Sequence, residues 1–462
     1  MQPTCVAGRV DLTDNQLANN MSGTEESLEI GDHKFIECIV PDVNGTAKGK
    51  SVSRKEFEQS EIRIAEAIFG QDVLGNWCDD HDLIDIADVD MVLVPDMTTL
   101  VTQPWADGTA QCICDCQLLN GESLDLAPRS ILKQIIGRFE DLGLRPVVAQ
   151  EAEFYLVQNN PDPLYPLRVA PGVSGRIPKS PRSFQMEAMA EYAPFIETMH
   201  QYASAQGIEL TGTIQEMGEG QIEVNFMHAD ALRKADEMFY FKRLTRQAAQ
   251  DSGFHATFMA KPMTSSPGSA MHLHQSLVDL ETGTNVFANS DGEFSDCFSA
   301  YLGGLQKYTP HIMALLAPHV NSYRRFESAE SCPTNVEWGI DNRTTGFRVP
   351  RSDAPATRIE NRIPGSDNNS YMAIAASLAC GYLGLMEELK PDQPVKESAW
   401  DLDHTIPRTL RESLEMLLSC EPLVDLFGER FVKLYVDMKQ REMDAFSEVV
   451  TAWEREHLLL TV

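Results

Sequence analysis

Short apolar runs separated by polar turns occupy the chain beyond about residue 30. They lie at 35–40, 91–95, 98–101 and 110–116. Runs of this length between turn residues predict β-strands, and the stretch 54–69 predicts one helix among them. We therefore expect a small β domain over residues 31–125, preceded by an extension at residues 1–30.

Longer segments in which apolar residues have the spacing of a helix begin after residue 125. Pro128 precedes an amphipathic stretch, 130–142, that ends at Gly143, which is a typical order of helix signals. Further helices are predicted at 187–205, at 229–250 and through most of the chain from residue 368, apart from a break at 391–407. Strands are predicted at 146–157, 221–226, 254–260, 270–278 and 344–362. These mixed elements indicate one large unit over residues 126–462.

The chain is strongly acidic, with 38 Lys and Arg against 69 Asp and Glu and a formal net charge of −31. This charge argues against nucleic acid or an anionic membrane as a partner, and it favours cationic ligands. The longest uncharged stretch, 371–386, is too short to span a bilayer and predicts a buried helix. Residues 1–30 lack the apolar core of a secretory signal, so we expect a cytoplasmic protein.

The ten cysteines do not have the spacing of a disulfide framework. Cys112, Cys114 and Cys116 alternate along a predicted strand and therefore point to one side of it. Neighbours of that kind do not form disulfides easily, and the pairs of cysteines two residues apart that are typical of zinc sites are missing. We expect reduced, buried thiols.

Two carboxylates lie on one face of the predicted strand 146–157. Glu151, Glu153 and Tyr155 share that face because successive strand residues point to opposite sides. Like charges in this position repel unless a cation or a proton lies between them, and two adjacent divalent metals would satisfy them. The alternative is a half-solvated strand with ordinary outward polar residues.

Four further segments have a similar character. They are a glycine-rich turn that can bring Glu216 and Glu223 together, a strand face with His272, His274 and Ser276, a second strand face with Arg358, Glu360 and Arg362, and a turn with Arg343 and Arg348. Each segment alone has an ordinary explanation as surface polarity or ion pairing. Together they suit hard divalent ions that bridge an anionic phosphate. The absence of cysteine ligands favours Mg²⁺ or Mn²⁺, two or more per site.

In this order, the segments resemble the glutamine synthetase family, type I-like. The motifs that carry the resemblance are Gln150-Glu151-Ala152-Glu153-Phe154, Gly220-Gln221-Ile222-Glu223, Lys234-Ala235-Asp236-Glu237, Phe258 to Met263, Met271 to Leu277, Asn321 to Arg325 and Arg358 to Arg362. The resemblance implies an α+β fold, in which a small β-grasp-like N-terminal domain precedes a catalytic domain with an antiparallel sheet funnel flanked by helices. It also implies a homo-oligomer, a dodecamer of two stacked hexameric rings.

The resemblance implies the following site residues. One metal is bound by Glu153, Glu216 and Glu223, and the other by Glu151, His272 and Glu360. Glutamate is held by Gly268, Arg325 and Arg362, and ATP is held by His274, Ser276, Arg343, Arg348 and Arg358. The catalytic residues are Arg343, Glu360 and Arg362. The implied reaction phosphorylates the γ-carboxylate of L-glutamate with ATP, because a carboxylate is a poor electrophile, and an amine then attacks the acyl phosphate.

The chain departs from the family where ammonium would bind. The two carboxylates that hold ammonium align with Gly70 and Ser331, although Asp72 and Glu330 are near enough in sequence to compensate. Small residues there would leave room for a bulkier primary amine, and the resemblance is closest to the γ-glutamylpolyamine (γ-glutamylputrescine) synthetase branch. An ammonia-dependent glutamine synthetase and an inactive structural or regulatory family member are the alternatives.

Two smaller departures concern binding and control. The Asn-Gly that precedes the histidine strand in the family is Pro267-Gly268 here. The tyrosine that some bacterial members adenylylate aligns with Trp400, which has no hydroxyl group, so we expect this control to be absent.

Overall fold

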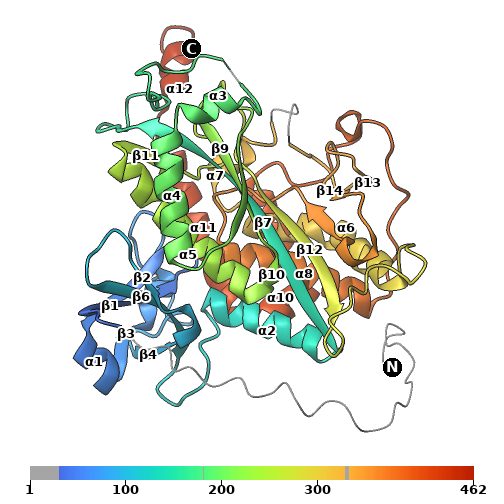
Figure 1. Ribbon diagram of the computed structural model, residues 1–462, viewed down its shortest axis with the longest axis horizontal. Coiled ribbons are helices and arrows are strands. Elements are labelled where there is room, and N and C mark those ends of the chain that lie inside the picture. The colour runs from blue at the N-terminus through green and yellow to red at the C-terminus, as the bar shows by residue number, and fades with distance from the viewer. Residues whose placement is uncertain (1–30, 181, 328–331) are drawn as a thin grey trace.

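Two sheets organise the part of the chain that the computed structural model describes, residues 31–180, 182–327 and 332–462 (Figure 1). The predicted extension at 1–30 lies outside these residues. The smaller sheet has the order β2-β1-β6-β4-β3, with β5 paired to β6. Its strands are β1 (Phe35–Pro41), β2 (Ala47–Ser53), β3 (Ile62–Ala65), β4 (Asp90–Pro95), β5 (Val101–Thr102) and β6 (Thr109–Gln117).

The predicted cysteine strand lies in the middle of this sheet. β6 pairs in parallel with β1 and antiparallel with β4, so both of its edges are covered. Cys112, Cys114 and Cys116 are buried and free, as expected.

The predicted helix 54–69 is wrong over its second half. Helix α1 (Arg54–Gln59) ends at Ser60, and the alternating residues that follow form β3, which pairs with β4. β-branched Ile62 and Ile64 favour a strand once a partner strand is available, and this partner comes from a distant segment. The predicted strand 98–101 is also partly replaced, because Asp96 caps a 3₁₀ turn, η2 (Met97–Thr99).

The larger sheet has the order β13-β14-β15-β12-β7-β9-β8, with β10 and β11 also paired to β7. Its strands are β7 (Leu144–Gln158), β8 (Leu210–Gln215), β9 (Gln221–Phe226), β10 (Ala229–Asp230), β11 (Phe254–Thr257), β12 (Met271–Asp279), β13 (Trp338–Ile340), β14 (Phe347–Val349) and β15 (Ile359–Asn361). All pairings are antiparallel except that of β13 with β14. The predicted α+β class is therefore confirmed. The predicted strand 344–362 is wrong as one element, because prolines at 350 and 355 interrupt it.

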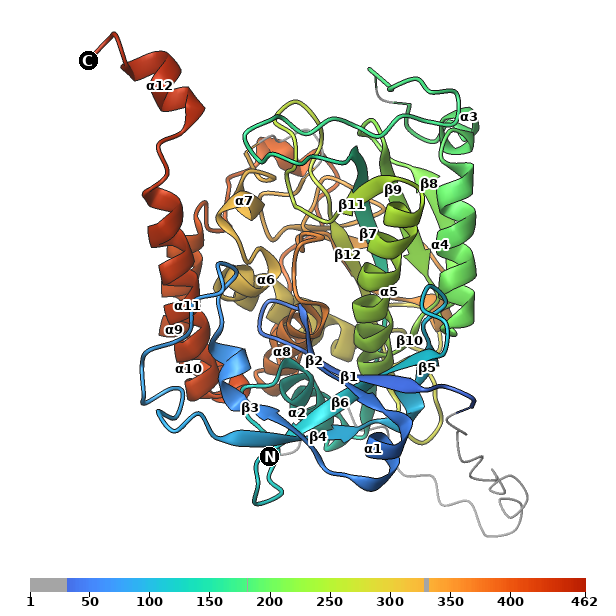
Figure 2. The same ribbon diagram turned by 90° about the vertical axis from the view of Figure 1, so that its left-hand side faces the viewer.

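Helices cover the larger sheet (Figures 1 and 2). The described helices after the small sheet are α2 (Pro128–Glu140), α3 (Met186–Ala190), α4 (Ala193–Ala205), α5 (Ala231–Asp251), α6 (Asp296–Leu316), α7 (Val320–Tyr323), α8 (Ser370–Met386), α9 (Leu410–Ser419), α10 (Glu421–Phe427), α11 (Glu429–Ser447) and α12 (Ala452–Leu458), of which α12 stands apart from the sheet. The 3₁₀ turns are η1 (Glu66–Gly70) between β3 and β4, and η3 (Ala354–Ala356) and η4 (Ala399–Asp401) in the larger unit. The uncharged α8 is buried, as predicted. The predicted helix 187–205 is split, because Pro194 occupies the first turn of α4. No helix in the described part of the chain is long and apolar enough to cross a membrane.

A buried ion cluster joins the two sheets. Arg129, in the first turn of α2, contacts Asp96 at 2.6 Å, Asp115 at 2.5 Å and Asp236 at 2.9 Å. These three carboxylates come from η2, β6 and α5, so one guanidinium connects the small sheet to the helices of the large one.

Candidate active site

Strand register brings the predicted carboxylates together. β7 pairs with β12 so that Glu151 lies opposite His272, and with β9 so that Glu153 lies opposite Glu223. On the far side of β12, His274 lies opposite Glu360 of β15. Cross-strand partners have Cβ atoms about 4.5–5.5 Å apart, so the side chains converge on one face of the sheet.

One carboxylate cluster contains Glu153, Glu216 and Glu223. Ligand atoms of these three residues all lie within 4.8 Å of one another. The turn between β8 and β9 makes this possible, because a Cβ atom on Gly218 would lie 2.0 Å from the Tyr155 hydroxyl oxygen, so only glycine fits. The Gln221 amide also donates to Glu153 at 3.1 Å.

The electrostatics of this cluster favour a bound cation. Burial, and then the charges of Glu151 and Glu216, raise the pKa of Glu223 to about 8. Burial and the neighbouring carboxylates also raise the pKa of Glu153 well above its ordinary value. Buried carboxylates this close hold protons unless a cation replaces them, so the donor set fits a hard divalent ion.

A second group surrounds Glu151. Its carboxylate lies 3.3 Å from His272 Nδ1 and 2.9 Å from His274 Nε2, and His272 Nδ1 lies 3.8 Å from Glu360. Burial, and then Arg362, lower the pKa of His272 to about 4, so its imidazole is neutral at pH 7 and can offer a lone pair. Ligand atoms fall within 4.8 Å in the sets Glu151, Glu223, His272 and Glu151, His274, Glu360. His274 therefore lies among the predicted metal ligands, although the sequence placed it with ATP.

Two arginines hold Glu360. Arg348 donates to it at 2.7 Å and Arg362 at 2.5 Å. Although burial favours the protonated carboxyl, the charge of Arg362 lowers the pKa of Glu360 to about 2, so it remains a carboxylate. Arg343 is exposed, and its charge acts on Glu216.

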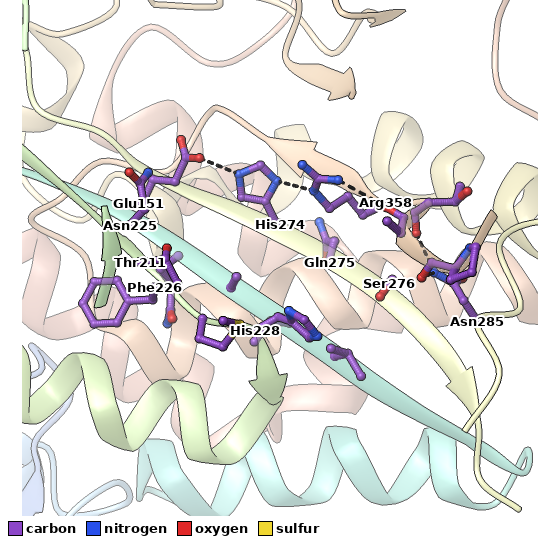
Figure 3. A pocket seen from close by; sticks show the side chains of 18 of the residues that line it. Glu151, Thr211, Asn225, Phe226, His228, His274, Gln275, Ser276, Asn285 and Arg358 are labelled. Carbon is purple, nitrogen blue, oxygen red and sulfur yellow. Dashed lines mark hydrogen bonds and ion pairs between the residues drawn. The ribbon is translucent and has the colours of Figure 1, made fainter. Parts of the chain in front are cut away.

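A cavity of about 460 Å³ opens beside this group (Figure 3). Arg358 Nε donates to His274 Nδ1 at 3.3 Å. Because Nδ1 accepts this bond, the imidazole proton is on Nε2 and points to Glu151. His274, Ser276 and Arg358, three of the five predicted ATP residues, line the cavity, whereas Arg343 and Arg348 are not among its described lining residues.

The sequence did not indicate several other residues of this cavity. Phe226 at the end of β9 and His228 two residues later also line it, together with Asn285 from the turn after β12. No local pattern marks them, because they become neighbours only when β9, β10 and the turn after β12 meet across the sheet.

The three predicted glutamate-binding residues are adjacent. Arg325 donates from Nη1 to the Ile363 carbonyl at 2.6 Å and from Nη2 to the Arg362 carbonyl at 3.0 Å. A Cβ atom on Gly268 would lie 2.6 Å from Arg325 Cγ, so glycine is needed for this close approach. Each Nη nitrogen of Arg325 retains one further N–H for a carboxylate.

Gly70 is the predicted amine-site residue that lies among the described residues, and it does not border an opening there. Gly70 is buried, and an added Cβ atom would lie 2.9 Å from Cys78 Cβ and 3.0 Å from Ile84. The Asp72 carboxylate already accepts from the Leu74 and Asn76 amides at 2.9 Å each, so it caps a turn. The expectation of free volume at Gly70 is therefore wrong for the single chain. Glu330 and Ser331 lie outside the described residues.

Comparisons with known proteins bear on the identity of this site. The family model for the glutamine synthetase catalytic domain matches residues 125–458. The chain is 35% identical over 426 residues to a glutamate–isopropylamine ligase of Pseudomonas sp, covering 89% of this chain and 92% of the relative. It is 32% identical over 437 residues to the γ-glutamylputrescine synthetase PuuA of Escherichia coli strain K12, covering 92% of each.

A solved structure gives the same result for the fold. Apo GmaS without ligand superposes with a TM-score of 0.80 at 25% sequence identity, covering 92% of this chain and 97% of that one. Together with the ligase and synthetase relatives, it confirms the predicted resemblance and the predicted enzyme class, a carbon–nitrogen ligase. The chain therefore belongs to the glutamine synthetase family.

Proposed function

We propose that the protein is an ATP-dependent ligase that joins the γ-carboxylate of L-glutamate to a primary amine through γ-glutamyl phosphate. The acceptor that we favour is a polyamine such as putrescine or spermine, in polyamine catabolism. The observation that carries the proposal is the pair of adjoining ligand groups around Glu153 and Glu151, with arginine-bound Glu360 at their edge.

The donor set fits two Mg²⁺ or Mn²⁺ ions. We assign Glu153, Glu216 and Glu223 to one ion and Glu151, His272 and Glu360 to the other, with His274 within reach of the second group. When bound, the ions would neutralise charge on the phosphoryl group that is transferred. Neutral His272 and ionised Glu360 are already in the protonation states that ligands require.

The protein's own residues would position the two anionic substrates. The 460 Å³ cavity can take the nucleoside of ATP, with its phosphates directed to the end where Arg358, His274 and Glu151 lie. Arg325 and Arg362, beside Gly268, would hold glutamate. Arg343, with Arg348 and Arg362, would stabilise negative charge that develops on the phosphoryl oxygens.

The relatives support an amine acceptor, and they give two candidates. The γ-glutamylputrescine synthetase supports a diamine or polyamine, which the net charge of −31 would also attract. The glutamate–isopropylamine ligase, at 35% identity, supports a small monoamine as the second candidate. Ammonia, as in the glutamine synthetase relatives, is the third.

The experiment is phosphate release from ATP and glutamate with one acceptor at a time: putrescine, spermidine, spermine, isopropylamine and ammonium. We expect the highest kcat/KM with a polyamine. If isopropylamine is the best acceptor, the monoamine candidate replaces the polyamine, and if ammonium is the best, the proposed acceptor class is wrong.

A matched control excludes activity from a contaminating host enzyme. The Glu153→Gln protein, purified in the same way, lacks one carboxylate of the predicted metal cluster and should release no phosphate above background. If the wild-type protein is equally inactive with every acceptor, it is an inactive family member with a structural or regulatory role.

We further propose the domain division and the assembly. Residues 31–125 would form the N-terminal domain and 126–462 the catalytic domain, which agrees with the separation into two sheets. The proposed homo-oligomer is a dodecamer of two stacked hexameric rings. Helix α12 and the residues after it support an oligomer, because α12 has no buried residue and the apolar side chains of Trp453, Leu459 and Leu460 are exposed.

A further inference from the structure

A second cavity, of about 660 Å³, lies between the N-terminal sheet and the catalytic helices. Its walls come from the β1–β2 turn at 44–47, from α5, from the end of β11 and from α7. Figure 2 shows this turn beside α5 and α8, and the Asn369 amide holds it by donating to the Asp42 carbonyl at 3.0 Å. None of the site residues described above lines this cavity.

The walls of this cavity are basic, although the chain as a whole is acidic. Helix α5 contributes Lys242, Arg243 and Arg246, and Asp367 is the one carboxylate among the described lining residues. Arg243 is neutralised by Glu37 of β1 at 2.8 Å. Lys242 and Arg246 are one helical turn apart, so their side chains share a face.

Lys242 and Arg246 form no ion pair with any described residue. Lys242 Nζ donates to the Asn368 carbonyl at 2.6 Å, and Arg246 donates to the Lys242 carbonyl at 3.4 Å. Both cations also lie over the Phe258 ring, at 5.7 and 5.2 Å from its centroid. The Asp367 carboxylate also lines the cavity and attracts Lys242, but it forms no ion pair with either of these two described cations; it accepts a hydrogen bond from the Ser322 hydroxyl at 2.6 Å.

The wall therefore carries two cations, buried Lys242 and exposed Arg246, against the one described carboxylate, and an anion bound between the two cations would reduce their mutual repulsion. Burial first, and the Arg246 charge second, lower the pKa of Lys242 to about 7. If the Lys242 position had only a structural role, an apolar residue there would avoid the free energy of burying a charge. Arg246 is nevertheless accessible to solvent at the cavity wall, so a ligand can reach it.

We propose that this cavity binds a small anion, a metabolite with a carboxylate or phosphate group, between Lys242 and Arg246. The cation pair would supply the charge, Phe258 an apolar wall, and the Asn321 and Asn368 side chains polar contacts. A volume of this size is ordinary for a small-molecule site. The site is separate from the nucleotide cavity, so its occupant need not be a substrate.

The experiment is calorimetric titration of the full-length protein in EDTA, with inorganic phosphate in one arm and succinate in the other. At least one of them should bind saturably to the wild-type protein, and the arm with the higher affinity identifies the class. Arg246→Gln should weaken that binding by about tenfold or more. Lys242→Met removes the other cation and should have the same effect.

Two control variants locate the bound anion. Arg233→Gln changes an arginine on the same helix that is 64% exposed and pairs with Glu237, so it should leave the affinity unchanged. Arg358→Gln changes the nucleotide cavity. If Arg358→Gln abolishes binding and Arg246→Gln does not, the anion occupies the nucleotide cavity and the proposal is wrong.

Two other outcomes also contradict the proposal. One is saturable binding that is equal in the wild-type and Arg246→Gln proteins. The other is no binding of either anion, together with a smaller assembly in the Arg246→Gln protein, which would show that an acidic side chain of a second copy pairs with these cations. Circular dichroism of each variant confirms that it is folded.

Discussion

Single residues in the candidate site acquire their chemistry from neighbours that are distant in sequence. Glu151 and Glu153 share a strand face, as their spacing predicts, yet their surroundings differ. Glu151 lies beside two imidazoles, which favour its charge, whereas Glu153 lies beside two other carboxylates, which oppose it. The same residue type therefore has opposite pKa shifts two positions apart.

Glu223→Gln tests the electrostatic account of the carboxylate cluster. The pKa of Glu223 rises to about 8 on folding, so without metal its contribution to stability is present below the unfolded-state pKa near 4.5 and is lost as the pH rises through 8. The glutamine variant lacks this penalty. In EDTA at pH 8.5 we expect it to have a higher free energy of unfolding than the wild-type protein, by about 1–3 kcal/mol.

The same variant should bind Mn²⁺ more weakly, since an anionic ligand is lost. Denaturant unfolding with EDTA and with Mn²⁺, at pH 5 and 8.5, measures both effects. Asn225→Ala is a matched control, because it keeps the Glu223 carboxylate and removes only the amide that donates to it at 3.1 Å and lowers its pKa, so it should not raise the stability at pH 8.5. Two outcomes would contradict this account. One is a Glu223→Gln protein that is less stable than the wild-type protein in EDTA at pH 8.5, and the other is a variant that binds Mn²⁺ as well as the wild-type protein does.

At the scale of elements, local pattern predicted most helices and strands, and its failures have a common cause. The hydrophobic pattern of 54–69 is compatible with both a helix and a strand. Only the pairing of β3 with β4 selects a strand for its second half. Helix 130–142 and the strand at 146–157 were predicted well because their own side chains bury one face or both. Short elements depend on partners that a local window does not contain.

Arg129→Met tests the connection between elements. The change removes the guanidinium shared by η2, β6 and α5 and leaves Asp236 buried without its counter-ion. Loss of one partner of a buried ion pair destabilises proteins by about 3–5 kcal/mol. We expect a loss of this size in the free energy of unfolding.

Lys133→Met is the matched control for this prediction. Lys133 contacts the same Asp115 at 2.5 Å, but it is partly exposed, so its loss should change stability by less than about 1 kcal/mol. Equal losses in the two variants, measured by denaturant unfolding, would show that burial of the cluster does not determine its strength.

At the scale of the whole molecule, the single chain leaves apolar surface uncovered at its C-terminal end. Leu459 is 73% and Leu460 is 93% exposed, and α12 stands apart from the body of the chain in Figure 2. A second copy is the occupant that the proposed ring assembly requires.

Removal of residues 449–462 tests this interpretation. Because α12 has no buried residue, the truncated chain should retain its secondary structure. The number of subunits in the assembly should fall, for example from that of a double ring to that of a single ring. Mass photometry measures the assembly, and circular dichroism measures the fold. An unchanged assembly mass would show that α12 does not join subunits.

The sequence by itself determined the family, the residue types of the site and most long elements. These properties depend on motifs and on short-range periods, which a linear chain displays. It also predicted that five carboxylates come together, and in the structure they fall into overlapping groups whose ligand atoms lie within 4.8 Å of one another: Glu151, Glu153, Glu216, Glu223 and Glu360.

Only the tertiary structure decided which groups meet. Strand register placed His274 against Glu151, and it drew Arg348 to Glu360 and away from the cavity of about 460 Å³. Packing also closed the space around Gly70, and it left Lys242 and Arg246 without an ion pair among the described residues. These outcomes depend on distances between segments far apart in the chain, and Coulomb interactions and hydrogen bonds follow those distances.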